Sequence, residues 1–189
     1  MKSRYRVRNL GRYRMLFVPS KKPFRMIGWK DKTKKSFPWY IKTFGNIAET
    51  YTKPSILALG MGVGMISDLN DNWSITYVEN NKEIIDIAKT HFWIPKEHEI
   101  INQDASTYYT KEKFNIIFYD LFQGNEVVRE YLTPSYIRKY KSFLKPGGKI
   151  IINTVDYPKN LNKYPYDYCY YQYPYFKGLS QNMILVLNT

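Results

Sequence analysis

The pattern of hydrophobic and polar positions changes about one sixth of the way along the chain. Residues 5–18 alternate between apolar and polar around an Asn-Leu-Gly turn, and residues 24–29 continue the alternation. Such a period of two predicts a β-hairpin with a further strand beside it. After Pro38 the period changes, and short apolar runs follow segments with helical spacing. The sequence therefore predicts a short N-terminal β-hairpin unit followed by a larger body.

The body reads as strands and helices in alternation. The strands are expected at 55–60, 74–79, 99–104, 114–120 and 148–155, and the helices at 40–51, 82–93 and 134–144, with 65–71 a helix or a turn. Strands that alternate with helices form parallel sheets through right-handed crossovers. Residues 168–176 and 182–188 are expected to add an antiparallel hairpin at the sheet edge. This predicts an α/β, Rossmann-like sheet that is mostly parallel.

Composition limits the class of protein. A chain of 189 residues fits one domain that buries roughly 70% of its unfolded surface, so it needs no disulfide or metal to fold. Cys169 is the single cysteine, and the sequence contains neither a secretory leader nor a run of 18 apolar residues. We therefore expect a cytoplasmic protein that is not embedded in a membrane. His91 and His98 lack metal-ligand spacing with Cys169, so no metal site is expected.

Positive charge is concentrated at the N-terminus. Thirteen of the 29 Lys and Arg residues lie in residues 1–35, where Asp31 is the one acid. The expected organisation is a basic N-terminal β-hairpin arm over 1–35 and a binding domain over 36–189. Such an arm favours contact with a polyanion, such as nucleic acid, a membrane surface or an acidic partner. The alternative is a solvated lysine-rich surface from a compositionally biased genome.

The ends of the predicted strands carry polar residues and glycines: Gly60, Glu79, Asp104 and Asp120. In open parallel α/β sheets, ligands bind beyond the carboxyl ends of the strands. The glycines of GMGVGM permit a tight turn and close approach of a ligand, and Glu79 is placed to accept hydrogen bonds from ribose hydroxyls. Asp104 is similarly placed for the exocyclic amine of adenine. The motif is GMGVGM rather than G-x-G-x-x-G, and the body is expected to end in an antiparallel hairpin. Together these two features favour an S-adenosylmethionine-type site over NAD, although turns also contain glycine for backbone reasons alone.

Residues 24–187 resemble the polyamine aminopropyltransferases, that is, the spermidine synthases and their shorter relatives, which share the class I methyltransferase fold. The matching stretches are FPWYIKTFGNIAETYTKPSILALGMGVG, ITYVENNKEIIDIAKTHFWIP, INQDAS, IIFYDLFQG, YLTPSYIRKYKSFLKPGGKIIINTV and NMILVLN. The most specific stretch is IIFYDLFQG followed by YLTPSYI, whereas KPGG is common across class I methyltransferases. The resemblance implies a transferase of polyamine biosynthesis.

The resemblance also implies roles for individual residues. Decarboxylated S-adenosylmethionine or S-adenosylmethionine is the implied cofactor, without a metal, and its implied contacts are Gly60, Met61, Gly62, Gly64, Glu79, Asn80, Asp104 and Ala105. Asp120 matches the catalytic aspartate, which would anchor and deprotonate the attacking amine. Asp120 and Gln123 are the implied substrate-binding residues. The alternative for Asp120 is a helix N-cap or a loop-turn aspartate.

Departures from the family pattern keep other functions open. Gln123 replaces a second acid of the family's active-site loop, and Asn81 replaces an acid that commonly follows the ribose-binding glutamate. The N-terminal unit is also shorter than the family domain that contributes to the amine site and to oligomer contacts, which leaves specificity for a diamine open. A homodimer is the assembly that the resemblance allows. The alternatives to aminopropyl transfer are an S-adenosylmethionine-dependent methyltransferase acting on an anionic substrate and a non-catalytic nucleoside-binding protein of the same fold.

Overall fold

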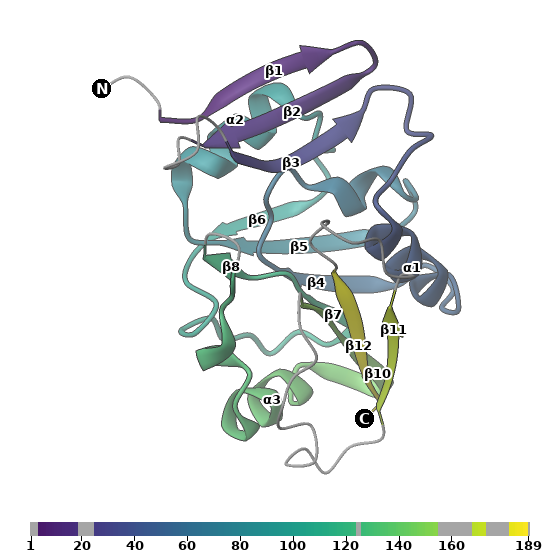
Figure 1. Cartoon of the computed structure of the whole chain (residues 1–189). Helices are drawn as coiled ribbons and strands as arrows, with labels where there is room; N and C mark the ends of the chain where they lie inside the picture. The colour runs from purple at the N-terminus through teal and green to yellow at the C-terminus, as the bar shows by residue number, and fades with distance from the viewer. Residues whose placement is uncertain (1–3, 19–24, 124–125, 155–167, 173–181, 189) are drawn as a thin grey trace.

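The computed structural model describes residues 4–18, 25–123, 126–154, 168–172 and 182–188. A three-stranded antiparallel sheet lies at the N-terminus, with the order β1-β2-β3 (Figure 1). Its strands are β1 (Arg6–Leu10), β2 (Tyr13–Val18) and β3 (Arg25–Asp31). The hairpin and the further strand predicted from the alternation are therefore present.

A seven-stranded sheet forms the body, with the order β11-β12-β10-β7-β4-β5-β6. Its strands are β4 (Ser55–Leu59), β5 (Ser74–Glu79), β6 (Glu99–Asn102), β7 (Phe114–Tyr119), β10 (Leu144–Thr154), β11 (Tyr168–Gln172) and β12 (Met183–Asn188). Five neighbouring strands of this sheet, β10, β7, β4, β5 and β6, run parallel to one another. Strand β12 runs antiparallel to both of its neighbours, β10 and β11. This confirms the predicted fold class, including the antiparallel C-terminal pair, although residues 173–176 and the predicted turn lie outside the described ranges.

The helices are α1 (Trp39–Ala48), α2 (Lys82–His91) and α3 (Pro134–Lys141), with 3₁₀ turns η1 (Met65–Asp68) and η2 (Arg129–Tyr131). The prediction of a helix through residue 144 was too long, because β10 begins at Leu144. Lys145 precedes Pro146, which disfavours helical backbone, and Gly147 has a φ of +70°. The short pair β8 (Phe122–Gln123) and β9 (Glu126–Val127) was not predicted from the sequence.

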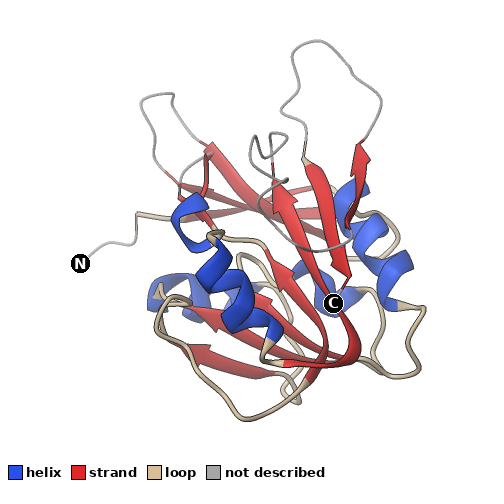
Figure 2. Ribbon diagram, turned by 90° about the horizontal axis from the view of Figure 1, so that it is seen from below, coloured by secondary structure: helices blue, strands red, loops and turns tan. Residues whose placement is uncertain are grey.

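Two hydrophobic clusters cover the two faces of the large sheet. Figure 2 shows the helices on either side of the strands of this sheet. On β4, Ile56 and Ala58 belong to the cluster beneath α1, α2 and the N-terminal sheet, whereas Leu57 and Leu59 belong to the cluster beneath α3. Successive strand residues point to opposite faces, so a strand covered on both sides must be apolar throughout. This explains the unbroken apolar runs in the body.

A buried ion pair joins the N-terminal sheet to the body. The Lys30 ammonium lies 2.9 Å from an Asp68 carboxylate oxygen, and the side chains are 0% and 6% exposed. Lys30 also donates to the Ser67 hydroxyl at 3.2 Å. On the same inner face, Leu16 is fully buried in the core. The sheet is thus held against η1, which directly follows the glycine turn.

Candidate functional site

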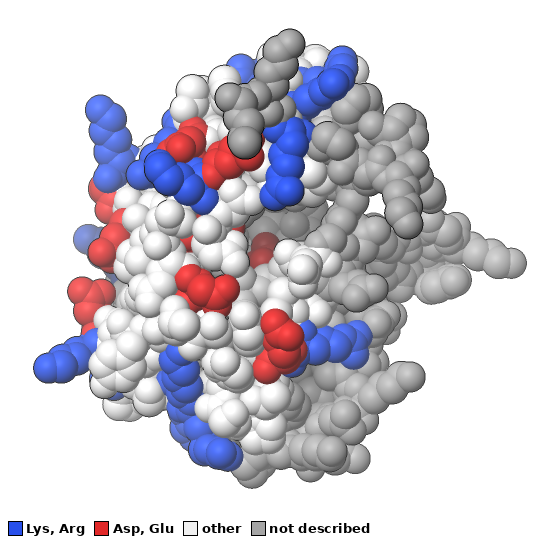
Figure 3. Space-filling view, turned by 90° about the vertical axis from the view of Figure 1, so that its left-hand side faces the viewer, with Lys and Arg blue, Asp and Glu red and all other residues white. Residues whose placement is uncertain are grey.

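The strand order reverses between β4 and β7, because the chain runs from β4 to β5 and β6 and then returns to the other side of β4. A crevice forms at the carboxyl ends of strands at such a switch point. Here a cleft that is open to solvent is lined by β3, α1, the glycine turn and the residue after β7. Figure 3 shows the surface hollowed between the N-terminal sheet and the rest of the body, with acidic side chains beside the hollow. Among the cleft's lining residues are Gly60, Met61, Gly62 and Asp120.

The three predicted glycines have left-handed backbones but different surroundings. A Cβ on Gly60 would lie 2.4 Å from the backbone oxygen of Asp120, so glycine lets the ends of β4 and β7 approach each other. A Cβ on Gly62 would meet nothing within 4 Å, so its backbone is open toward a ligand. A Cβ on Gly64 would lie 2.2 Å from the Ile94 side chain, and Gly64 is not among the residues that line the cleft.

Glu79 closes the glycine turn. One carboxylate oxygen accepts the Met61 backbone N–H at 3.1 Å, and the other accepts the Asn81 backbone N–H at 2.9 Å. Each carboxylate oxygen can accept a further hydrogen bond, so the side chain keeps capacity for ribose hydroxyls. The side-chain oxygen of Asn81 caps α2 by accepting the backbone N–H groups of Glu83 and Ile84. The side-chain nitrogen of Asn81 donates to the Tyr5 hydroxyl at 2.8 Å. Asn81 therefore connects the N-terminal segment to the body.

Asp104 lies beyond β6, next to the end of β5. Its carboxylate accepts the Ser106 backbone N–H at 2.8 Å and the Asn80 side-chain amide at 3.3 Å. The hydrogen bonding from Ser106, followed by that from Asn80, lowers the pKa of Asp104 against the opposing effect of burial. Ala105 is buried in the cluster on the α3 side. The structure thus brings the predicted adenine and ribose residues to one edge of the sheet.

Asp120 is held at the cleft by an asparagine. The Asn153 side-chain amide donates to its carboxylate at 2.7 Å. Burial raises the pKa of Asp120 to about 6, the negative charge of Glu79 adds to the increase, and the hydrogen bond from Asn153 opposes it. An acid with this pKa is mostly ionised at pH 7 and can still take up a proton. Gln123, by contrast, is exposed on β8 and does not line the cleft.

Two residues at the site were not predicted from the sequence. Tyr40, from α1, lines the same cleft as Asp120. Burial, followed by the charge of Asp120, raises the pKa of the Tyr40 phenol, which therefore stays protonated and can donate a hydrogen bond. The sequence contains a signal for Asn153, because this polar residue interrupts an apolar strand near the carboxyl end of the strand. The sequence contains no such signal for Tyr40, because an aromatic residue near the start of a helix usually packs in a core.

No group of three or more potential metal ligands gathers within the part of the chain that the structure describes. His98 is buried, and neither of its ring nitrogens has a hydrogen-bond partner. Cys169 is exposed on β11.

Across the same described ranges, none of the helices has the length and apolar character to cross a bilayer.

The strand order, the glycine turn and the acids at the strand ends define the class I methyltransferase fold. The chain is 22% identical, over 129 residues, to a polyamine aminopropyltransferase of Vibrio vulnificus (strain CMCP6), an alignment that covers 62% of this chain and 43% of that protein. It thus spans less than half the length of this curated relative. No protein-family model matches the chain.

Solved structures show the same resemblance. A probable spermidine synthase from Corynebacterium glutamicum ATCC 13032 superposes with a TM-score of 0.69 at 17% identity, covering 96% of this chain and 79% of that one. Human methyltransferase-like protein 13 in complex with SAH superposes with a TM-score of 0.60 at 17% identity, covering 80% and 82%. The relatives and structural neighbours are transferases, and the resemblance expected from the sequence is confirmed.

Proposed function

We propose that this protein is a spermidine synthase-like transferase that moves an aminopropyl group from decarboxylated S-adenosylmethionine to a polyamine nitrogen. The observation that carries the proposal is Asp120, a carboxylate with a raised pKa, held by Asn153 in a cleft at the switch point of the sheet. A carboxylate attracts a protonated amine and accepts a proton from it.

The glycine turn and the neighbouring acids suit a sulfonium nucleoside. The open side of Gly62 leaves backbone accessible, and Glu79 and Asp104 are carboxylates at adjacent strand ends that can accept hydrogen bonds from hydroxyl and amine groups. Apolar side chains, including Ile27, Ile41 and Phe118, line the cleft beside Asp120. These apolar side chains exclude part of the water from the space in which the aminopropyl group would react.

Asp120 performs the proton transfer that the proposed reaction requires. When bound, the sulfonium compound supplies a carbon activated toward a nucleophile. Asp120 orients the amine and takes one proton from its nitrogen, whose lone pair then forms the new N–C bond. The C–S bond breaks, its electron pair stays on sulfur, and methylthioadenosine leaves. Asp120 then releases the proton to solvent, which balances the reaction.

A second candidate is methyl transfer from S-adenosylmethionine to an anionic substrate. The observation that favours it is that two positions where the relatives carry acids are uncharged in this chain: Gln123 is exposed on β8, and Asn81 serves as a helix cap. A site with fewer carboxylates attracts a polyamine less strongly. The third alternative is a protein of this fold that binds a nucleoside without turnover.

The deciding experiment supplies each sulfonium compound with its acceptor. Protein is incubated with decarboxylated S-adenosylmethionine and putrescine or spermidine, and in parallel with S-adenosylmethionine, and products are identified by mass spectrometry. We expect an aminopropylated amine and methylthioadenosine. Methylated product alone would favour the second candidate, and nucleoside binding without either product would favour the third.

Asp120→Asn tests the assigned role. It keeps the size of the side chain but removes its charge and basicity, so turnover should fall by roughly 10²-fold or more while methylthioadenosine affinity stays within about twofold. Asp86→Asn, which removes an exposed acid from α2, is the matched control and should keep full activity. A fully active Asp120→Asn variant would remove Asp120 from the mechanism.

A further inference from the structure

The N-terminal sheet has two chemically different faces. In its register, Arg6 pairs with Phe17, Arg8 pairs with Met15, and Met15 pairs with Trp29. Directly paired residues lie on the same face of a sheet. Their neighbours Leu16 and Lys30 lie on the opposite, inner face, which packs against the body. We define the outer face by Arg6, Arg8, Tyr13, Met15, Phe17 and Trp29.

The aromatic and aliphatic side chains of the outer face do not belong to the buried core. None of its side chains is among those of the two buried clusters, whereas Leu16, between Met15 and Phe17, is fully buried. The Tyr13 and Trp29 rings meet edge to face with centroids 5.3 Å apart, and the Arg12 guanidinium lies 5.3 Å from the Tyr13 centroid. A row of partly exposed aromatic rings therefore lies beside guanidinium groups.

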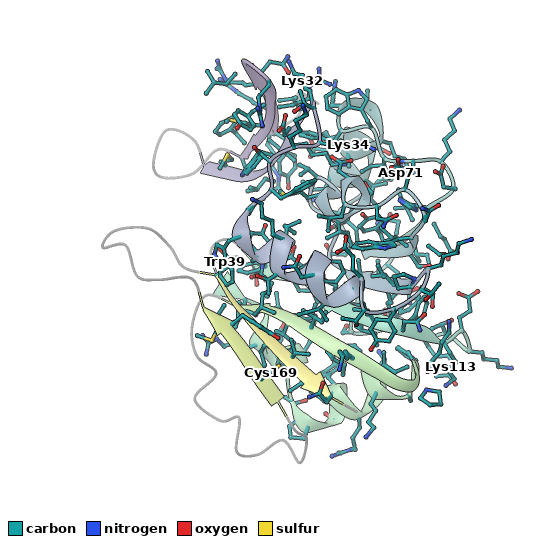
Figure 4. The ribbon with its side chains drawn as sticks, turned by 90° about the vertical axis from the view of Figure 1, so that its right-hand side faces the viewer. Lys32, Lys34, Trp39, Asp71, Lys113 and Cys169 are labelled. Atoms are coloured by element: carbon teal, nitrogen blue, oxygen red, sulfur yellow. The ribbon has the colours of Figure 1, made fainter. Side chains whose placement is uncertain are left out.

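The N-terminal segment that forms this sheet is strongly basic in sequence. Residues 1–35 carry thirteen bases and only Asp31 as an acid. Asp31 is itself bound to Arg12 at 2.5 Å. Although burial opposes the change, hydrogen bonds from Thr33 and Arg12 lower the pKa of Asp31 to about 2. Figure 4 shows Lys32 and Lys34 on the segment that follows the sheet, with Lys34 beside Asp71, its ion-pair partner at 3.0 Å.

We propose that the outer face binds single-stranded nucleic acid, with bases stacked on Phe17, Trp29 and Tyr13 and phosphates bound by Arg6 and Arg8. Sequence-tolerant single-strand binders combine these two features, a basic track for the backbone and aromatic rings for the bases. A duplex hides the faces of its bases and offers only phosphate contacts to such a surface. A two-fold contact between copies would bring the like-charged arginines of two outer faces together, which disfavours a second copy as the occupant.

Fluorescence anisotropy with labelled 12-nucleotide oligo(U) and oligo(dT), and with a duplex of equal length, tests the proposal in a salt series. We expect the single strands to bind more tightly than the duplex. Phe17→Thr/Trp29→Val should weaken single-strand binding about tenfold or more with little change in the salt slope. Arg6→Gln/Arg8→Gln should reduce the slope of log affinity against log salt by about 1.4, that is, about 0.7 for each phosphate that an arginine no longer neutralises.

Lys53→Gln/Lys111→Gln removes two exposed positive charges outside the N-terminal sheet and is the matched control. It should bind single strands within about twofold of the wild type. Circular dichroism checks folding, and if the aromatic variant does not fold, the arginine variant alone decides. Duplex binding as tight as single-strand binding, or wild-type affinity and slope in the folded variants, would overturn the proposal. So would a dimer in sedimentation that Phe17→Thr converts to monomer, because a second copy would then cover the face.

Discussion

The side-chain amide of Asn153 donates a 2.7 Å hydrogen bond to the carboxylate of Asp120, across the boundary between β10 and β7. Asn182, just before β12, donates to the side-chain oxygen of Asn153 at 2.8 Å. The second bond fixes the orientation of the Asn153 amide, so that its nitrogen and not its oxygen meets Asp120. A chain of two asparagines thus positions the carboxylate in the cleft.

The first prediction concerns pH. Because Asp120 has a pKa of about 6 and accepts a proton only when ionised, kcat/KM should rise with pH through about 6 and fall toward tenfold per unit below it. Asn153→Leu removes the hydrogen bond that lowers the pKa, so this acidic limb should move to higher pH. Rate profiles of the two proteins provide the measurement. A limb that stays in place in the variant would show that Asn153 does not tune Asp120.

The second prediction concerns the cofactor. Glu79→Ala removes a carboxylate expected to accept charge-assisted hydrogen bonds from the ribose, so methylthioadenosine binding should weaken by about 1.5–3 kcal/mol. Calorimetric titration measures the change. Glu112→Ala, which removes an exposed acid elsewhere, should bind like the wild type. Equal affinity in the Glu79 variant would place the ribose somewhere else.

The third prediction compares two glycines of one turn. Gly60→Ala places a methyl group 2.4 Å from the Asp120 backbone oxygen at a φ of +88°, so the ends of β4 and β7 must separate. Gly62→Ala meets no atom within 4 Å and bears only the cost of a left-handed alanine, about 1–2 kcal/mol. Thermal unfolding should therefore show a larger loss for Gly60→Ala. Besides this small loss of stability, Gly62→Ala should lower the affinity for methylthioadenosine, because the open backbone of Gly62 is expected to contact the nucleoside.

The fourth prediction concerns the ion pair between Lys30 and Asp68. Burial lowers the pKa of Lys30 and raises that of Asp68, so each charge is costly without its partner. Lys30→Met alone should destabilise the fold by about 3–5 kcal/mol, because it leaves Asp68 buried and unpaired. Lys30→Met/Asp68→Leu should recover most of that loss. Denaturant unfolding of the single and double variants measures the coupling, and equal losses in both would argue against a mutual dependence.

Local sequence patterns determined the order of the elements. The change from a period of two to alternating strands and helices follows directly from which faces are buried, so β1 to β3 and the parallel body were predictable. Glu79, Asp104 and Asp120 were predictable as strand-end residues, because a polar residue after an apolar run marks the point where a strand leaves the core. The division of the chain at residue 35 and the ligand roles of these acids stay predictions.

The tertiary structure alone decided which of these residues meet. Asn153 and Asp120 are 33 positions apart, Lys30 and Asp68 are 38 apart, and neither pair shares an element. Their contacts depend on the order of strands in the sheet and on the docking of β3, which periodicity does not specify. The same holds for Tyr40, which reaches the cleft because α1 packs beside β7, and for Gln123, which β8 carries away from it. Residue type and period act locally, whereas a site forms between segments that only the folded packing brings together.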